Sequence, residues 1–359
     1  MTVSLNGQSS MEKKSLYEGS TQFRHWRFSS TSLAKLRASQ NAEAVAKIRN
    51  AFEDDSPGSS STIQFLSADE EYFLVKLYIS KISQLCAHFR FPEEVEATAV
   101  SYLKRFYLRN TVMDYHPKNV MLTAIFLAAK TSNHPIGIEQ YVHSIPKTKP
   151  ADVLDLEFLV AQSLRFEFTV WHAHRALWGI WLDVQSLPVP KTLSSYNQVT
   201  SEDEYGQALE RVRASRMTDA ELIFTPSQIA LACLHSVSPA LAEQWVDLKS
   251  PNSADAVMET VSRIQEIIDT QSAPPDLVMV KDIDRRLKIC TNPEKVVGSK
   301  AYLAKQAEIE AEAARKRAKK AEGLRAMERD PFADDTPGAT IVPTESQFSA
   351  LNPTRDHKM

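Results

Sequence analysis

The feature that most constrains the fold is the segment Met121-Leu-Thr-Ala-Ile-Phe-Leu-Ala-Ala129, which is apolar on almost every side and is preceded by Pro117 and followed by Lys130. A helix with so little polar surface is stable only when other elements cover it all round. The segment therefore predicts a helix at the centre of a helical bundle. Lys130, at the end of that helix, is expected to need a carboxylate partner.

Composition limits the class of protein. The chain has 359 residues, of which 43% are hydrophobic, enough for two compact domains with tails. Only 9 glycines favour helices over hairpin-rich sheets and phosphate-binding loops. Three widely spaced cysteines, Cys86, Cys233 and Cys290, indicate reduced, buried thiols of an intracellular protein. No signal peptide or membrane-spanning run is evident, so we expect an all-α protein without a membrane partner.

The pattern around Pro117 occurs a second time. Pro117, Val120 and Leu122 align with Pro226, Ile229 and Leu231, about 110 residues further on, which is about one domain length. We interpret this as a duplicated five-helix unit with flanking helices. The expected parts are a disordered N-terminus over 1–20, an anchor helix and linker over 21–62, a first repeat over 63–168, a second repeat over 169–275, C-terminal helices over 276–330 and a disordered tail over 331–359.

Helix signals fill in these parts. Capping boxes predict helix starts at Ser67 (with Glu70) and Thr225 (with Gln228). Further helices are expected over 32–52, from Pro92, from Pro117, over 138–145, from Pro150 to about 166, over 174–186, 204–224, 257–268, 277–290 and 301–329. Phe23, Trp26 and Phe28 do not fit a helical stripe and are expected to anchor an extended segment. The composition of residues 54–61 predicts a flexible linker.

Signals of catalysis are weak or missing. The sequence has no G-x-G-x-x-G, phosphate-binding loop, G-x-S-x-G or H-E-x-x-H motif. His172 and His174 are two positions apart, so on a helix they would point to different faces, which is poor metal geometry. We therefore expect no catalytic residue, metal or cofactor.

One pair of charged residues stands out. Glu157 lies among Leu156, Phe158 and other apolar residues, and is either solvated on a narrow face or paired. Lys130 lies at the carbonyl end of the buried helix, where a positive charge is favourable. Periodicity leaves two interpretations open: ordinary surface residues, or a functional pair.

Three segments carry a family resemblance. Residues 103–117, 126–130 (Phe-Leu-Ala-Ala-Lys) and 224–231 (Phe-Thr-Pro-Ser-Gln-Ile-Ala-Leu) resemble the cyclin family, and within it the cyclin H type; residues 24–29 also resemble the cyclin H amino terminus. The resemblance covers about residues 20–290. It implies two five-helix repeats that bind a cyclin-dependent kinase and push its αC helix inward.

The resemblance also implies site residues. Lys130 and Glu157 match the pair that holds the kinase segment near αC, and Phe166 matches a hydrophobic kinase contact. Trp26, with Phe23 and Phe28, is expected to anchor against the chain's own repeats or the kinase. The implied role is that of a non-catalytic kinase activator. Two family features are missing: the acidic pair after the lysine is replaced by Thr131-Ser-Asn-His134, and the Met-Arg-Ala-Ile-Leu docking patch is absent.

The implied partners are the kinase of transcription factor IIH, a third subunit that assembles the CDK-activating kinase, and indirectly the core of that factor. The implied outcome is phosphorylation of the RNA polymerase II tail, in the nucleus. Alternatives are a transcriptional cyclin of the C, K or T type, or a DNA-binding cyclin-box factor. DNA binding needs clustered basic residues, and the only basic run, 315–320, lies in the expected tail helix; we expect no direct nucleic-acid partner.

Overall fold

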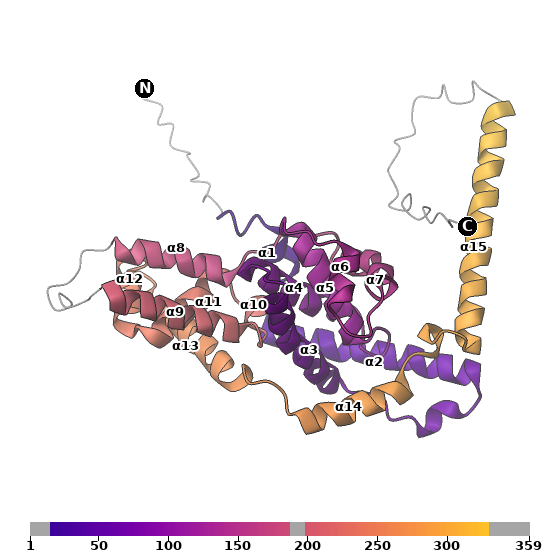
Figure 1. The fold of residues 1–359 in the computed structure, drawn as a ribbon, viewed down its shortest axis with the longest axis horizontal. Helices are drawn as coiled ribbons and strands as arrows, with labels where there is room; N and C mark the ends of the chain where they lie inside the picture. The colour runs from indigo at the N-terminus through magenta and orange to yellow at the C-terminus, as the bar shows by residue number, and fades with distance from the viewer. Residues whose placement is uncertain (1–14, 187–197, 330–359) are drawn as a thin grey trace, which may run out of the picture. The chain divides into compact units, whose positions relative to one another are not determined.

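The computed structural model describes residues 15–186 and 198–329, and every regular element among them is a helix. The first repeat comprises five helices: α3 (Ala68–His88), α4 (Glu93–Phe106), α5 (Pro117–Thr131), α6 (Ile138–His143) and α7 (Pro150–Ser163) (Figure 1). The side chains from Val120 to Ala129 are all buried, and α5 packs against α3, α4 and α7. The prediction of a central buried helix after Pro117 is confirmed.

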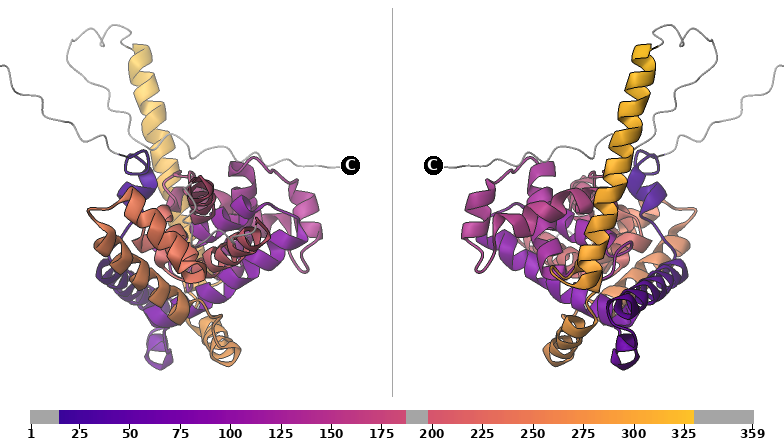
Figure 2. Two further views of the ribbon diagram at one scale, coloured as in Figure 1. Left: turned by 90° about the vertical axis from the view of Figure 1, so that its left-hand side faces the viewer. Right: turned by 90° about the vertical axis from the view of Figure 1, so that its right-hand side faces the viewer.

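The second repeat has the same plan. Its helices are α8 (Ala173–Gln185), α9 (Gln198–Ser215), α11 (Pro226–Val237), α12 (Pro239–Lys249) and α13 (Ala254–Gln271), with a short α10 (Ala220–Ile223) between α9 and α11. The central helix is α11, which packs against α8, α9, α12 and α13. The left panel of Figure 2 shows this repeat nearest the viewer. The all-α class and the duplication are confirmed.

The second repeat differs from the sequence-based expectation in two places. The single helix expected over 204–224 is interrupted after Ser215, because the buried Thr218 hydroxyl donates to the Ser215 carbonyl and accepts from the Ala220 N–H. That one side chain bonds both the last residue of α9 and the first residue of α10. Helix α12 was not predicted at all, although proline at its first position is a common helix start.

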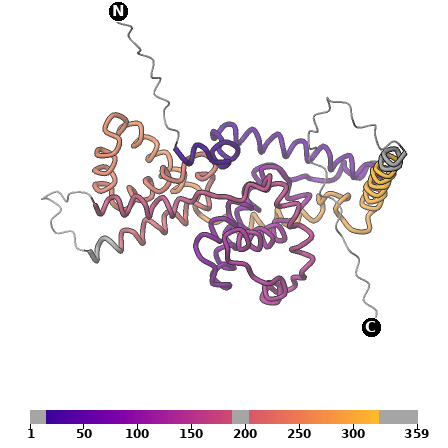
Figure 3. The backbone as a smooth tube through the Cα atoms, turned by 90° about the horizontal axis from the view of Figure 1, so that it is seen from above, coloured from indigo at the N-terminus to yellow at the C-terminus, as the bar shows by residue number. Residues whose placement is uncertain are grey.

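The N-terminal flank is more ordered than its composition predicts. It contains α1 (Thr21–His25), α2 (Ser30–Asp55) and the 3-10 helix η1 (Ser59–Thr62), and α2 runs along the first repeat (Figure 3). Tyr17, expected to be disordered, packs edge-on against Phe23. The aromatic segment, expected to be extended, begins with a short helix. Residues 1–14 lie outside the described part.

The linker expected over 54–61 is a hydrogen-bonded turn. The Glu53 carboxylate accepts from the Gly58 N–H at 2.6 Å and the Ser60 N–H at 3.1 Å.

Both capping boxes, at Ser67 and Thr225, are present as predicted. Local side-chain-to-backbone bonds, which depend on nearby residues alone, therefore explain these starts.

The C-terminal flank contains three helices: α14 (Leu277–Cys290), the 3-10 helix η3 (Pro293–Lys295) and α15 (Lys300–Arg329). Of these, α14 packs on α3. From Tyr302 on the chain forms a separate unit. Within α15, Lys316 and Glu312 pair at 2.8 Å, as their spacing predicts. The expected disordered tail, 331–359, lies outside the described residues. No helix in the described ranges is both long and apolar enough to cross a membrane.

Candidate functional site

The predicted pair of Lys130 and Glu157 is present. Lys130 Nζ donates to Glu157 Oε1 at 2.5 Å, joining the end of α5 to the middle of α7. The same ammonium group lies 4.5 Å from the centroid of the buried Phe126 ring. The side chains are 41% and 25% exposed, so both remain accessible from outside. The structure thus confirms the pairing and places it at the surface.

Large apolar side chains surround this ion pair. Phe158 and Phe166 are 56% and 54% exposed, with ring centroids 6.0 Å apart, and Leu154 on the same helix is also exposed. A cluster of exposed aromatic groups beside an ion pair is typical of a protein-binding surface. We call Lys130, Leu154, Glu157, Phe158 and Phe166 the α5–α7 surface.

The backbone explains why Phe166 faces outward. Arg165 and Phe166 have φ values of +56° and +58°, a region that residues other than glycine seldom adopt. The Arg165 N–H donates to the Gln162 carbonyl and the Phe166 N–H to the Ala161 carbonyl, both at 2.9 Å, which holds this turn at the end of α7. Strained backbone of this kind often occurs at functional sites.

Sequence reasoning missed Phe158 as a site residue. It follows Glu157 directly, and in the sequence it looks like one more apolar residue of α7. Its helical position could have revealed it, because Leu154, Glu157 and Phe158 are spaced by three and four residues and so share a face.

Trp26 does not belong to this surface. Its indole is 2% exposed, and its N–H donates to Glu167 at 2.6 Å. The guanidinium groups of Arg105 and Arg109 lie 5.1 and 5.4 Å from the ring. In this structure Trp26 therefore anchors against the chain's own repeats, and its burial does not favour a contact with the kinase.

Trp26 is part of a segment that joins the two repeats. We call residues 20–37 the N-terminal strap. Within it, Gln22 exchanges hydrogen bonds with the backbone of Trp171 in the connection between the repeats, at 2.7 and 3.2 Å. Arg37 forms two hydrogen bonds to Asp219, at 2.6 and 2.7 Å, just before α10. The strap therefore contacts both the connection between the repeats and the second repeat.

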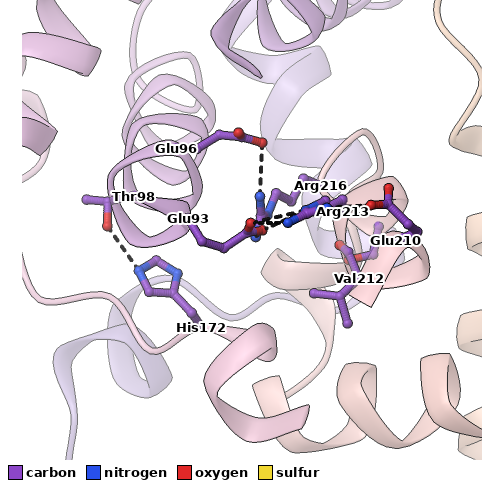
Figure 4. Close-up of polar contacts among 9 residues, drawn as sticks. Glu93, Glu96, Thr98, His172, Glu210, Val212, Arg213 and Arg216 are labelled. Carbon is purple, nitrogen blue, oxygen red and sulfur yellow. Dashed lines mark hydrogen bonds and ion pairs between the residues drawn. The ribbon is translucent and has the colours of Figure 1, made fainter. Parts of the chain in front are cut away.

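A polar cluster joins the repeats directly (Figure 4). Glu93, at the start of α4, accepts hydrogen bonds from Arg213 of α9 at 2.7, 3.1 and 3.2 Å and also contacts Arg216, which bonds Glu96 at 3.0 Å. Burial alone would raise the pKa of Glu93, but the Arg213 hydrogen bonds and the Arg216 charge outweigh it and lower the pKa to about 2. The Glu93 carboxylate is therefore strongly held in its charged form.

The two histidines beside this cluster lie together, not apart. The rings of His172 and His174 are stacked, 5.1 Å between centroids at 20°, and His172 Nε2 is 3.0 Å from the Thr98 hydroxyl. The two rings can stack because His172 precedes α8 and is not on it, so the pair is not spaced on a helix. Burial lowers the pKa of His172 well below its usual value and that of His174 to about 4. Both rings are thus neutral at pH 7.

Within the described ranges, no three His, Cys, Asp or Glu side chains are grouped to hold a metal ion. The three cysteines are buried and unpaired, and burial raises the pKa of both Cys86 and Cys233 to about 12. Thiols so protonated are poor nucleophiles.

Comparison with known proteins agrees with the repeat structure. The family model "Cyclin, N-terminal domain" matches residues 68–169 and "Cyclin C-terminal domain" matches 172–271. The putative cyclin-H of Dictyostelium discoideum is 31% identical over 220 residues, covering 61% of this chain and 74% of the relative.

Two solved structures are also similar. A chain of the CAK complex of Chaetomium thermophilum bound to ATP-gamma-S superposes with a TM-score of 0.71 at 26% identity, covering 90% of this chain and 98% of the other. A chain of the yeast TFIIK (Kin28/Ccl1/Tfb3) complex gives 0.59 at 28%, covering 70% and 100%. The chain therefore belongs to the cyclin family, and within it to the cyclin H group of regulatory cyclins that activate cyclin-dependent kinases.

Proposed function

We propose that the α5–α7 surface is where this cyclin binds its kinase. The observation that carries the proposal is the Lys130–Glu157 pair, half-exposed and flanked by Phe158 and Phe166. Lys130 can donate to backbone carbonyl groups of the kinase, and Glu157 can accept from its backbone N–H groups. Because the two side chains already hold each other, less conformational entropy is lost on binding.

The aromatic residues supply the apolar part of the contact. In this proposal Phe158 and Phe166 pack against the kinase segment next to αC, and burying exposed aromatic rings commonly provides much of an interface's energy. A cyclin that docks there holds αC inward, so that the kinase's Lys–Glu pair forms. In this proposal the chain does no chemistry itself; it reshapes the protein that does.

The wider assembly follows from the relatives. The yeast structure contains a kinase, Kin28, and a third chain, Tfb3, beside Ccl1. We propose that this chain likewise joins a kinase of the transcription factor IIH type and a third assembly subunit, acts in the nucleus and supports phosphorylation of the RNA polymerase II tail. The basic run 315–320 is solvent-exposed on α15, outside the two repeats, and we propose no DNA-binding role for it.

Alanine variants of the pair test the binding site. Lys130→Ala or Glu157→Ala should weaken kinase binding by about 2–5 kcal/mol, because each leaves one charge unpaired in the interface. Stability of the free cyclin should change by less than about 1 kcal/mol, because the pair is at the surface. The matched control is Lys81→Ala, an exposed lysine of α3.

A charge swap separates binding from folding. The double variant Lys130→Glu/Glu157→Lys keeps an internal ion pair but presents reversed charges to the kinase. It should melt within a few degrees of the wild type and fail to activate the kinase. Wild-type affinity in the swap and in both alanine variants would remove the assignment.

A further inference from the structure

The turn after α2 contains an accessible Ser-Pro sequence. Ser56, Pro57 and Gly58 are exposed and connect α2 to η1. Serine or threonine followed directly by proline is what proline-directed protein kinases require of a substrate. The described part of the chain has four such sequences, at Ser56, Thr225, Ser238 and Ser250.

Three of the four are unsuited to modification. The Thr225 hydroxyl is used as a helix cap, accepting from the Gln228 N–H. The Ser238 hydroxyl bonds the Glu204 carboxylate. Ser250 is half-buried, and its ψ of 51° is not extended. In these positions the acceptor oxygen or the backbone is unavailable to a kinase active site.

Ser56 differs in each respect. Its side chain is exposed, its φ and ψ of −155° and 111° are extended, and within the described residues its hydroxyl makes no hydrogen bond. Its N–H donates to the Phe52 carbonyl at 2.9 Å, so only the last turn of α2 must open for a longer segment to become extended.

The surroundings of Ser56 are strongly acidic. Asp54 and Asp55 precede it, and Glu53 holds the turn through its bonds to the N–H groups of Gly58 and Ser60. Gly58 has a φ of +82°, so the turn depends on a residue without a Cβ. A phosphate at this position would add negative charge at the carbonyl end of α2 and beside these carboxylates, which is unfavourable.

We propose that Ser56 is a phosphorylation site for a proline-directed serine/threonine kinase, and that the phosphate loosens the turn over residues 56–61. The γ-phosphoryl group of a nucleoside triphosphate is transferred to Ser56. The bond between Ser56 Oγ and the γ phosphorus forms, and the bond between that phosphorus and the β,γ-bridging oxygen breaks. The serine proton passes to the kinase's base, and the nucleoside diphosphate leaves. The donor enzyme can be the kinase that this cyclin binds or another of the same specificity.

Loosening this turn would affect side chains that pack at the edge of the first repeat. Ala51 and Ser60 are buried on either side of it, and the Phe52 and Phe65 rings lie 6.2 Å apart. These contacts hold the end of α2 to the segment that leads into α3. Phosphorylation would therefore act on the flank helix without touching the α5–α7 surface.

The first test maps the phosphate. The full-length chain, free and in complex with its own kinase, is incubated with ATP; the free chain also receives an active cyclin-dependent kinase as probe, and tandem mass spectrometry locates the label. We expect phosphate on Ser56 in at least one arm, none in Ser56→Ala, at least a tenfold loss in Pro57→Ala, and no change in the control Ser250→Ala. The proposal is overturned if Ser56 carries no phosphate either in the complex or in the free chain treated with the probe kinase, or if Pro57→Ala is labelled fully.

The second test measures the turn. Amide hydrogen exchange over residues 56–61 should become at least tenfold faster in the phosphorylated chain, whereas kinase-treated Ser56→Ala should match the untreated protein. Unchanged exchange in a chain phosphorylated at Ser56 would overturn the loosening.

Discussion

The α5–α7 surface and the N-terminal strap are built from the same kinds of contact and end in opposite environments. On the surface, Lys130 pairs with Glu157 at 2.5 Å beside Phe166, which is 54% exposed. In the strap, Trp26 donates to Glu167 at 2.6 Å and is 2% exposed. An aromatic ring, a carboxylate and a cation are present in both. What differs is whether a second element covers them.

This difference separates stability from recognition. Burying a large aromatic ring contributes to the free energy of folding, whereas an exposed ring leaves that energy available for a partner. The strap therefore stabilises the folded cyclin, whereas the α5–α7 surface is available to bind a partner. The following variants can break or sharpen this division.

The largest effect is expected for Trp26→Ala. Removing a buried indole should destabilise the free chain by about 3–5 kcal/mol, because a cavity is left and Glu167 loses a donor. Thermal or urea unfolding measures the change. Trp178→Ala, on a 50% exposed tryptophan of α8, is the matched control and should change stability by less than about 1 kcal/mol. Equal effects would erase the distinction between buried and exposed aromatics.

Next comes Phe166→Ala, with the opposite profile. Kinase affinity should fall by about 2 kcal/mol or more, as at a hot spot, while unfolding stays within about 1 kcal/mol of the wild type. Calorimetric titration with the kinase measures the first quantity. Leu248→Ala, on a side chain 53% exposed in α12, is the control and should bind normally. A loss of stability without a loss of affinity would place Phe166 with the strap.

A smaller effect is expected at the second capping box. Thr225→Ala removes the acceptor of the Gln228 N–H at the start of α11 and should cost about 0.5–2 kcal/mol. Thr225→Ser keeps the hydroxyl and should recover most of it. An unchanged melting temperature in the alanine variant would show that tertiary packing alone sets this helix start.

Stability should also depend on pH, through the cluster between the repeats. His174 has a pKa near 4, below the usual 6.5, so its neutral form is favoured by folding and stability falls as the pH drops from 6.5 toward 4. Glu93, with a pKa near 2 against 4.5, adds a second fall between pH 4.5 and 2. His174→Asn should make the first fall shallower, and the exposed His143→Asn should not. Melting curves at stepped pH test this.

Elements with local causes were predictable from the sequence. The bounds of α14 coincide with the predicted 277–290, which follow from apolar spacing, and α5 follows the predicted helix to within a residue because Pro117 marks its start. The capping boxes depend on residues three apart and were also found. The Lys130–Glu157 pair spans 27 residues; periodicity left it open, and the family resemblance selected it.

Features caused by distant contacts were not predictable. Trp26 is buried because residues distant in the sequence cover it, among them Leu108, Glu167 and Leu222. The break between α9 and α10 depends on the burial of Thr218. The carbonyl of Thr218 accepts a hydrogen bond from the Lys104 ammonium group, which lies in the first repeat. The stacking of the His172 and His174 rings depends on where the connection between the repeats ends and α8 begins. In each case the sequence gives the residue type, and tertiary packing gives the role.

The strap also affects the order of events during synthesis. Arg37 must wait for Asp219, 182 residues later, before it can form its two hydrogen bonds. At translation rates of about 5–20 residues per second, this delay lasts roughly 10–40 s. Throughout that time the Trp26 indole lacks Leu222, its neighbour from the second repeat, so the nascent chain carries a partly uncovered aromatic segment that chaperones can bind until α10 emerges from the ribosome.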